Sequence, residues 1–163
     1  MKVKRILIPL IALLVLFAVA PVMAAPATKT PFTTHVTFIT GNVSPREMWT
    51  TQGNILQIKE STSAGNVSGD ISGTVLLTMD ETLDLNTGLG VNHGKFVITL
   101  TGGTYEGSSR SMFTDLSFSG TFIAHGSGSV ERQVLMGSFE GVITIVDSLH
   151  LVNVVFEGVI LSS

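Results

Sequence analysis

The sequence contains no cysteine. This absence excludes thiol catalysis, thiolate metal sites and the lipid-modified cysteine of a lipoprotein anchor. It also excludes disulfides, which a secreted domain does not need when its hydrophobic core is adequate. Charged residues are scarce, at 13% of 163 residues, and the mean hydropathy is +0.48. Much of that apolar character is concentrated at the N-terminus.

The N-terminus has the three-part layout of a secretory signal peptide. Lys2, Lys4 and Arg5 precede an apolar run over residues 6–22, and residues 22–24 place small side chains at −3 and −1 of a cleavage site. We expect residues 1–24 to be removed and the protein to be secreted or held in the cell envelope. The alternative is a retained anchor helix, for which the run is short and contains Pro9.

The expected mature chain is acidic. Removing residues 1–24 leaves six basic side chains against 12 acidic ones. This balance, without a basic stripe, argues against nucleic acid as a partner. No later apolar run approaches the ~20 residues of a membrane-spanning helix, so we expect no membrane association after cleavage. We expect residues 25–31 to form a flexible leader and residues 32–163 to form one domain.

Proline is absent after Pro45, and no stretch of ten or more residues has helical apolar spacing. Alternation of apolar and polar residues dominates instead, which is typical of half-buried antiparallel strands. The clearest case is residues 67–85, where only Leu76 and Glu81 break the pattern, and a bulge or break near Asp80–Glu81 fits the second exception. The sequence predicts about eight strands, at residues 32–40, 55–60, 67–85, 94–100, 104–113, 116–124, 135–145 and 149–161. The expected fold is all-β, a continuous antiparallel meander.

A short repeat favours a closed barrel over a flat sandwich. Its pattern is a bulky residue, any residue, glycine, any residue and an apolar residue, with the glycine on the apolar face. Glycine weakens a strand interior, so its repeated use calls for a geometric cause. Strongly bent strands that close into a barrel supply that cause, with aromatic rings covering the exposed backbone. The copies begin at Ile71, Phe118, Phe139 and Phe156, with a partial copy at Tyr105.

Several further motifs resemble one group of small barrels. The motifs are Trp49-Thr-Thr-x-Gly53-Asn54, Gly65-Asn-Val-x-Gly69, Thr87-Gly88-x-Gly90-x-x-x-Gly94-x-Phe96 and Gly102-Gly103-Thr-Tyr-Glu-Gly107. Together they resemble the calycin-like barrels of the allene-oxide-cyclase-like and dirigent-like group, from about Thr34 onward. The resemblance implies an eight-stranded barrel whose apolar interior can hold a small lipid-like or phenolic ligand. None of the cyclase's catalytic positions can be placed on this sequence.

Motifs for familiar chemistry fail on spacing. The stretch from Gly88 to Lys95 lacks the glycine and hydroxyl positions of a phosphate loop, so a hairpin is the better interpretation. Asp84-x-Asn86-x-Gly88 begins like a calcium loop, but Lys95 stands where its bidentate glutamate belongs, and a turn is expected. His35, His93, His125 and His150 lack metal-ligand spacing and are expected at the barrel surface. A serine-hydrolase elbow is absent. We expect no catalytic residue, metal or cofactor.

The position of three glutamate side chains depends on which face of the strands lines the lumen. If the bulky face points inward, Glu106, Glu140 and Glu157 lie in solvent. In an inverted barrel they would lie inside, where burial would raise their pKa and suit them to acid–base work. Two sequons, at Asn42 and Asn66, would be glycosylated only in a host with that machinery.

The sequence therefore predicts a secreted, non-catalytic β-barrel that binds a small apolar ligand. The expected ligand-binding residues are aromatic: Trp49, Tyr105, Phe118, Phe122, Phe139 and Phe156. Trp49 could instead plug the barrel, and the interior could be filled by its own side chains. One rival is an isomerase or cyclase of the allene-oxide type, which a buried carboxylate or inward polar groups would support.

The other rival is an envelope structural protein that forms oligomers through the apolar last strand, from Val152 to Leu161. In that case Val154, Phe156 and Ile160, or else Val155, Val159 and Leu161, would form the interface.

Overall fold

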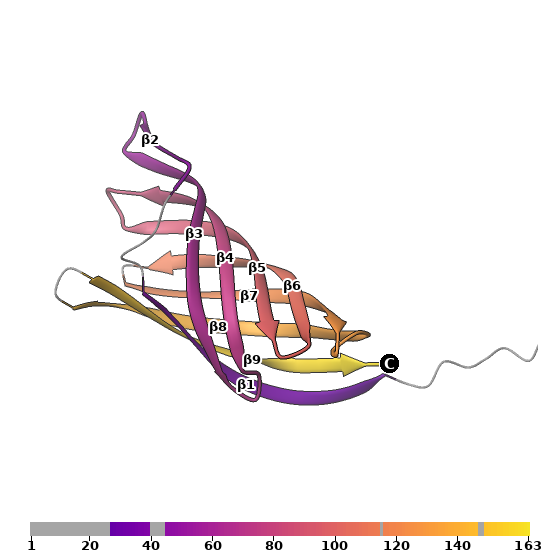
Figure 1. Cartoon of the computed structure of the whole chain (residues 1–163). Coiled ribbons are helices and arrows are strands. Elements are labelled where there is room, and N and C mark those ends of the chain that lie inside the picture. The colour runs from indigo at the N-terminus through magenta and orange to yellow at the C-terminus, as the bar shows by residue number, and fades with distance from the viewer. Residues whose placement is uncertain (1–26, 40–44, 115, 147–148) are drawn as a thin grey trace, which may run out of the picture.

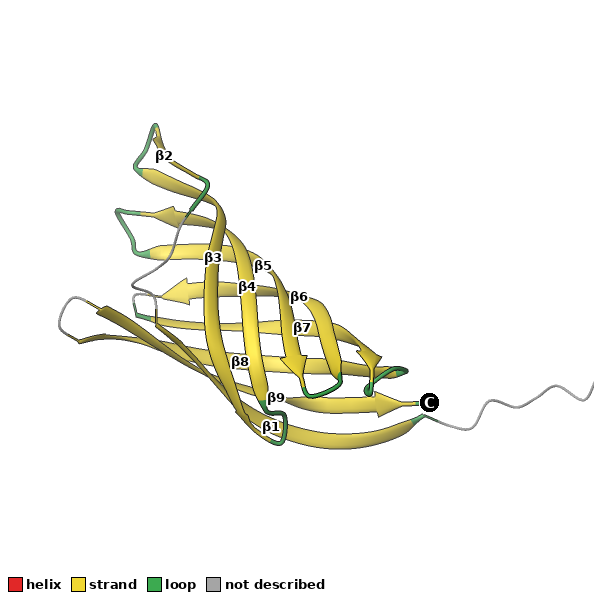
Figure 2. Cartoon of the chain, in the orientation of Figure 1, coloured by secondary structure: helices red, strands yellow, loops and turns green. Residues whose placement is uncertain are grey.

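The computed structural model describes residues 27–39, 45–114, 116–146 and 149–163. The expected signal peptide and Asn42 lie outside these residues. Within them the chain forms nine strands and no helix (Figures 1 and 2). The strands are β1 (Thr28–Ile39), β2 (Glu47–Thr51), β3 (Ile55–Gly69), β4 (Gly73–Asp84), β5 (Leu89–Leu100), β6 (Gly103–Thr114), β7 (Ser117–Gly128), β8 (Gln133–Val146) and β9 (Leu149–Ser162).

Eight of the strands close into an antiparallel barrel, which confirms the predicted fold class. The meander runs in order from β3 to β9, and β1 pairs with both β9 and β3 (Figure 1). The short strand β2 pairs only with the first part of β3 and stands outside the ring. Because β1 closes the ring, no barrel strand is left with a free edge along its whole length.

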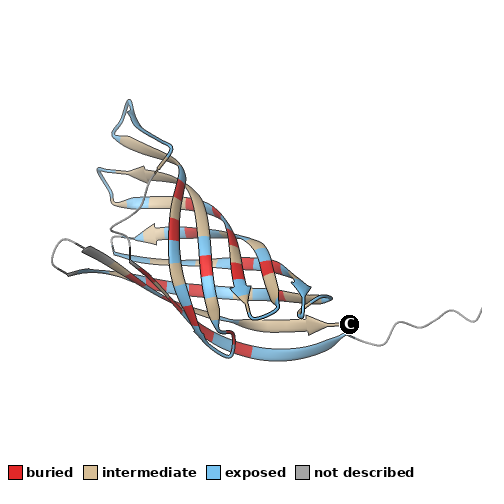
Figure 3. Cartoon of the chain, viewed as in Figure 1, coloured by how far each residue is buried: buried red, intermediate tan, exposed pale blue. Residues whose placement is uncertain are grey.

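The bulky face of the strands points inward. On β8, Leu135 and Phe139 are buried, whereas Glu140, the residue after Phe139, is exposed. Buried positions are interspersed with exposed ones along the barrel strands (Figure 3). Glu106 and Glu157 are exposed as well. The inverted barrel, with these acids in the lumen, is therefore wrong. Apolar side chains gain about 1.5–3 kcal/mol each when they are fully buried, and this gain decides the orientation.

Two glycines show why the repeat is needed. Phe118 on β7 lies directly opposite Gly141 on β8, and Phe139 lies opposite Gly120. A Cβ added at Gly141 would lie 2.1 Å from the nearest Phe118 ring atom, and one at Gly120 would lie 2.7 Å from the Phe139 ring. Each ring thus covers the bare backbone across from it, as expected for glycine-kinked strands. The two rings meet edge to face, with centroids 6.2 Å apart.

The long strand predicted over residues 67–85 is wrong in its first part. A turn at residues 70–72 separates β3 from β4. The turn is held by β1: Thr33 donates its backbone N–H to Asp70 Oδ2 at 2.9 Å, and the Thr34 hydroxyl donates to the Ile71 carbonyl at 2.7 Å. Because these bonds come from a distant strand, the local pattern alone does not reveal them.

The first strand begins earlier than the sequence predicts. β1 starts at Thr28, so it takes in residues 28–31 of the expected flexible leader. In this part β1 pairs with β9 only, and its register with β3 begins at Thr34. Pro31 is therefore tolerated, because its missing N–H faces an unpaired strand edge.

Candidate ligand-binding cavity

One end of the barrel is packed with its own side chains. Phe32 and Phe122 meet edge to face with ring centroids 6.2 Å apart, and Leu135 beside them is 1% exposed. Tyr105 is buried, its hydroxyl donates a hydrogen bond to Gln133 Oε1, and burial raises the pKa of Tyr105. This end therefore fits the prediction that side chains could fill the barrel.

The other half of the barrel holds a cavity of about 510 Å³. Its walls come from all eight barrel strands, from Met48 on β2 and from Pro45 just before β2. Met48 is 63% exposed, so the cavity reaches the surface at this end. A cavity of this size suits a small-molecule ligand. The apolar lining includes Val36, Phe38, Ile58, Val75, Leu77, Met79, Phe96, Ile98, Phe113, Phe118, Phe139, Ile143, Val152, Val154 and Phe156.

The aromatic residues singled out from the sequence divide into three groups. Phe118, Phe139 and Phe156 line the cavity, where Phe139 and Phe156 stack with centroids 5.1 Å apart. Tyr105 and Phe122 lie deeper, in the buried core. Trp49 is 41% exposed on β2 and is not among the residues that line the cavity.

A polar row crosses the wall formed by β4, β5 and β6. Glu81 lies directly opposite Asn92, and Asn92 lies directly opposite Ser111. Directly opposite residues share one face of a sheet, so these side chains all point into the barrel. The Ser111 hydroxyl donates to Asn92 Oδ1 at 2.7 Å, and both residues are buried. Glu81 on β4 stands across the lumen from β8, which carries Phe139, since β4 and β8 lie four strands apart in an eight-stranded ring.

Two buried hydroxyls on β3 have no partner within the described residues. Ser61 is 0% and Ser63 is 7% exposed, and neither Oγ atom has a hydrogen bond there. Both side chains line the cavity. An unsatisfied buried hydroxyl costs about 1–3 kcal/mol, so a polar group in the cavity would relieve this cost.

A β-bulge in β3 aims these serines inward. Ile58 pairs with Glu81 and Ser61 pairs with Met79, so Lys59 and Glu60 together oppose the single residue Asp80. The extra residue reverses the alternation, because Ile58 faces the lumen before the bulge and the odd-numbered serines face it afterwards. The sequence predicts an irregularity near Asp80, but the extra residue lies in β3, and β4 itself is continuous.

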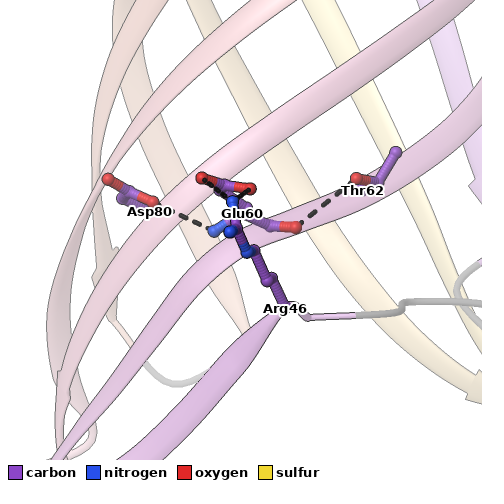
Figure 4. Close-up of polar contacts among 4 residues, drawn as sticks. All are labelled: Arg46, Glu60, Thr62 and Asp80. Atoms are coloured by element: carbon purple, nitrogen blue, oxygen red, sulfur yellow. Dashed lines mark hydrogen bonds and ion pairs between the residues drawn. The ribbon is translucent and has the colours of Figure 1, made fainter.

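The bulge is fastened by charges on the outer face of the barrel. Glu60, with φ of 52°, donates its backbone N–H to Asp80 Oδ1 at 3.0 Å, and Lys59 Nζ lies 3.1 Å from Asp80 Oδ2. The backbone bond from Glu60, followed by the Lys59 ammonium, lowers the pKa of Asp80. Arg46 pairs with the Glu60 carboxylate, and the Thr62 hydroxyl donates to the Glu60 carbonyl (Figure 4).

Glu81 is the single ionisable side chain among the described residues that line the cavity. Burial in the apolar lumen raises its pKa, because desolvation disfavours the charged carboxylate. The sequence flags Glu81 only as an exception on an apolar face. Asn92 carries a similar signal, since it continues the inward face of Gly94, Phe96 and Ile98 by one more step.

The remaining motifs lie on the outer surface or in turns. His35, His93 and His125 are exposed, as predicted, and the side chain of His150 lies outside the described part of the chain. Asp84 accepts the backbone N–H of Asn86 at 2.9 Å in the turn before β5, which lowers the pKa of Asp84.

The described part of the chain has no cluster of three or more metal-ligating side chains. It also has no helix whose length and apolar character would let it cross a membrane.

Comparison with protein-family models, with curated proteins and with solved structures gives no match. The function is therefore argued from the cavity itself.

Proposed function

We propose that this protein is a secreted, non-catalytic barrel that binds a small, mainly apolar ligand in its lumen. The cavity of about 510 Å³ is the observation on which this proposal rests. Ligand sites are commonly concave and apolar, with a few polar groups that fix orientation. The lumen has this character, because Glu81 and Asn92 interrupt a mainly apolar lining and Phe139 on β8 stands across the barrel from β4.

The unfilled half of the barrel favours ligand binding over a purely structural role. Small barrels can be filled completely by side chains, and here the filling covers only the end around Tyr105 and Leu135. An empty cavity and two buried hydroxyls that have no partner among the described residues lower the stability of the barrel, and a bound ligand would reduce this cost. The resemblance to allene-oxide-cyclase-like barrels remains part of this proposal, as does secretion.

An isomerase or cyclase is the second candidate, and one observation favours it. Glu81 is an inward carboxylate whose pKa is raised by burial, next to Asn92. A carboxyl group with a raised pKa can serve as a general acid or base. Turnover of a bound ligand by the unmodified protein, abolished by Glu81→Gln, would favour this candidate over binding alone.

The oligomerisation candidate is restricted to one face of β9. Val154, Phe156 and Ile160 point into the barrel, so they cannot form an interface between intact barrels. Val155, Val159 and Leu161 are on the opposite face and are half-buried. Sedimentation that shows only monomer at tens of micromolar would exclude this candidate.

The test of binding compares two tryptophan variants of neighbouring residues. Leu77 lines the cavity, whereas Leu76 points outward and is 50% exposed. Leu77→Trp places a large ring in the lumen and should weaken binding of the neutral probe N-phenyl-1-naphthylamine at least tenfold. Leu76→Trp makes the same chemical change outside the wall and should leave the probe affinity unchanged.

A parallel measurement looks for the natural occupant. Native mass spectrometry of the secreted protein, followed by solvent extraction, should detect a bound small molecule in stoichiometric amount. Probe binding that is absent from the unmodified protein, or equal in both tryptophan variants, would contradict a ligand site in the lumen.

A further inference from the structure

The chemistry of the cavity wall restricts the kind of ligand, on the assumption that the proposed binding function is correct. The described lining residues include the Glu81 carboxylate but no lysine, arginine or histidine. An anionic headgroup would therefore enter a low-dielectric site that holds a negative charge and offers no cation. Such a juxtaposition of like charges is unfavourable.

Polar atoms that can accept hydrogen bonds lie opposite Glu81 on β5 and further along the cavity wall on β3. Asn92 Oδ1 already accepts one bond from Ser111 and has a second lone pair. The hydroxyl oxygens of Ser61 and Ser63, both more than nine-tenths buried and without partners in the described residues, can accept too. An ammonium group at Glu81 can donate to the carboxylate and to Asn92 Oδ1, because Asn92 lies directly opposite Glu81. Ser61 and Ser63 lie opposite Met79 and Leu77, further toward the packed end, where they are open to a second polar group of the ligand.

The opposite wall suits the rest of such a molecule. Phe118, Phe139 and Phe156 present aromatic rings to the cavity. These rings pack against hydrocarbon, and their faces attract a cation that approaches them. The cavity thus combines an apolar body site with one acidic, acceptor-rich corner.

We propose that the lumen binds an apolar amine, whose ammonium group pairs with Glu81 and whose hydrocarbon body lies against the aromatic wall. Burial raises the pKa of Glu81 in the empty cavity, and a bound cation would lower it again. Binding of the amine therefore couples to ionisation of Glu81, and affinity should rise with pH through the pKa of this carboxyl group.

Among the residues that the structure describes, the other charged side chains near Glu81 do not line the cavity. Glu81 pairs with Ile58 on β3 and with Asn92 on β5, and neither of these residues is ionisable. On β2, Met48 pairs with Ile58. The bulge charges Arg46, Lys59, Glu60 and Asp80 are paired with one another and, like His93 opposite Asp80, do not line the cavity.

The experiment compares three ligands with the same chain: decan-1-amine, decan-1-ol and decanoate. Isothermal titration calorimetry on the extracted protein at pH 7.5 should rank them amine, alcohol, decanoate, with the amine at least tenfold tighter than decanoate. Glu81→Gln should weaken the amine roughly tenfold to a hundredfold, the factor for losing a charge-assisted hydrogen bond, and should strengthen decanoate. Glu106→Gln removes the same charge from the outer face and should change none of the affinities.

The pH profile gives a second readout that needs no variant. Affinity for decan-1-amine should increase between pH 5 and pH 8 in the unmodified protein, whereas affinity for decan-1-ol should not increase. Decanoate or decan-1-ol binding as tightly as the amine would overturn the amine proposal and leave the binding function standing. Failure of all three ligands and of the neutral probe to bind would overturn both.

Discussion

Replacing Gly141 by alanine tests the reason for the repeated glycines. The added Cβ would lie 2.1, 2.6 and 2.7 Å from three ring atoms of Phe118, so the ring has to move. That ring also packs edge to face against Phe113 and Phe139, with centroids 6.1 and 6.2 Å away, which limits its freedom. Overpacking of this kind costs about 1–3 kcal/mol.

Part of this cost is offset in the unfolded chain. Alanine has fewer backbone conformations than glycine, which stabilises the folded state by about 0.4–1 kcal/mol. We therefore expect Gly141→Ala to lower the free energy of unfolding by about 1–2 kcal/mol. In a domain of this size the Tm would fall by about 4–8 °C.

The assay is urea unfolding followed by far-UV circular dichroism, with a double-mutant cycle. Phe118→Leu removes the ring edge that the new methyl group would strike, so Gly141→Ala should cost at least about 1 kcal/mol less in that background. Ser138→Ala, at an exposed position of the same strand, is the control and should stay within about 0.5 kcal/mol. Additive effects in the cycle, or a Gly141→Ala variant as stable as the unmodified protein, would refute this account of the glycines.

Two further predictions concern pH. The pKa of Glu81 is raised in the folded protein, so ionisation of this carboxyl group costs stability as pH rises above the unfolded value of about 4.3. Glu81→Gln should therefore have a higher Tm than the unmodified, ligand-free protein at pH 7.5. The difference in Tm should disappear near pH 4. The folded pKa of Asp80 is lowered, first by the Glu60 N–H and then by Lys59, so its contribution is present above about pH 4 and is lost as pH falls through the folded pKa. Asp80→Asn should therefore be less stable than the unmodified protein at pH 7, and this loss should shrink as the pH is lowered. Thermal scans check both variants. A variant whose Tm differs from that of the unmodified protein by the same amount at pH 7 and at pH 3 would contradict the pKa direction given for its residue.

The alternation of apolar and polar residues predicts most of the strands but does not reveal the turn at residues 70–72. Val67 pairs with Gly73, so the positions that face inward on both strands of this hairpin are odd-numbered. The apolar pattern therefore continues through the turn without a change of phase, and Ile71 within it is buried at the packed end. The only local signal for a hairpin is the glycine, serine and aspartate of residues 68–73, which are typical of a turn, and the unbroken alternation obscures it.

The candidate site is harder to predict because its residues violate the pattern that identifies strands. Ser61 and Ser63 face the lumen, so the second half of β3 does not look half-apolar. The bulge at Lys59 and Glu60 also shifts the phase between Ile58 and these serines. Hydrophobic periodicity finds the three lining phenylalanines on β7, β8 and β9, whereas the acidic corner depends on strand register, which periodicity does not supply.

The pairing of Thr28 with Ser162 has a consequence for how the protein can be attached to anything else. The start of β1 and the end of β9 lie at the same end of the barrel as the turns at residues 101–102 and 129–132, and β2 lies at the opposite end (Figure 1). The first of these ends is the packed end, and the cavity reaches the surface at the other, beside Pro45 and Met48. An affinity tag, a fusion partner or a solid support joined to the start of β1 or to the end of β9 would lie at the packed end of the barrel, away from the cavity opening. A sensor built on this chain would thus present its opening to the solution, whichever terminus is used for immobilisation.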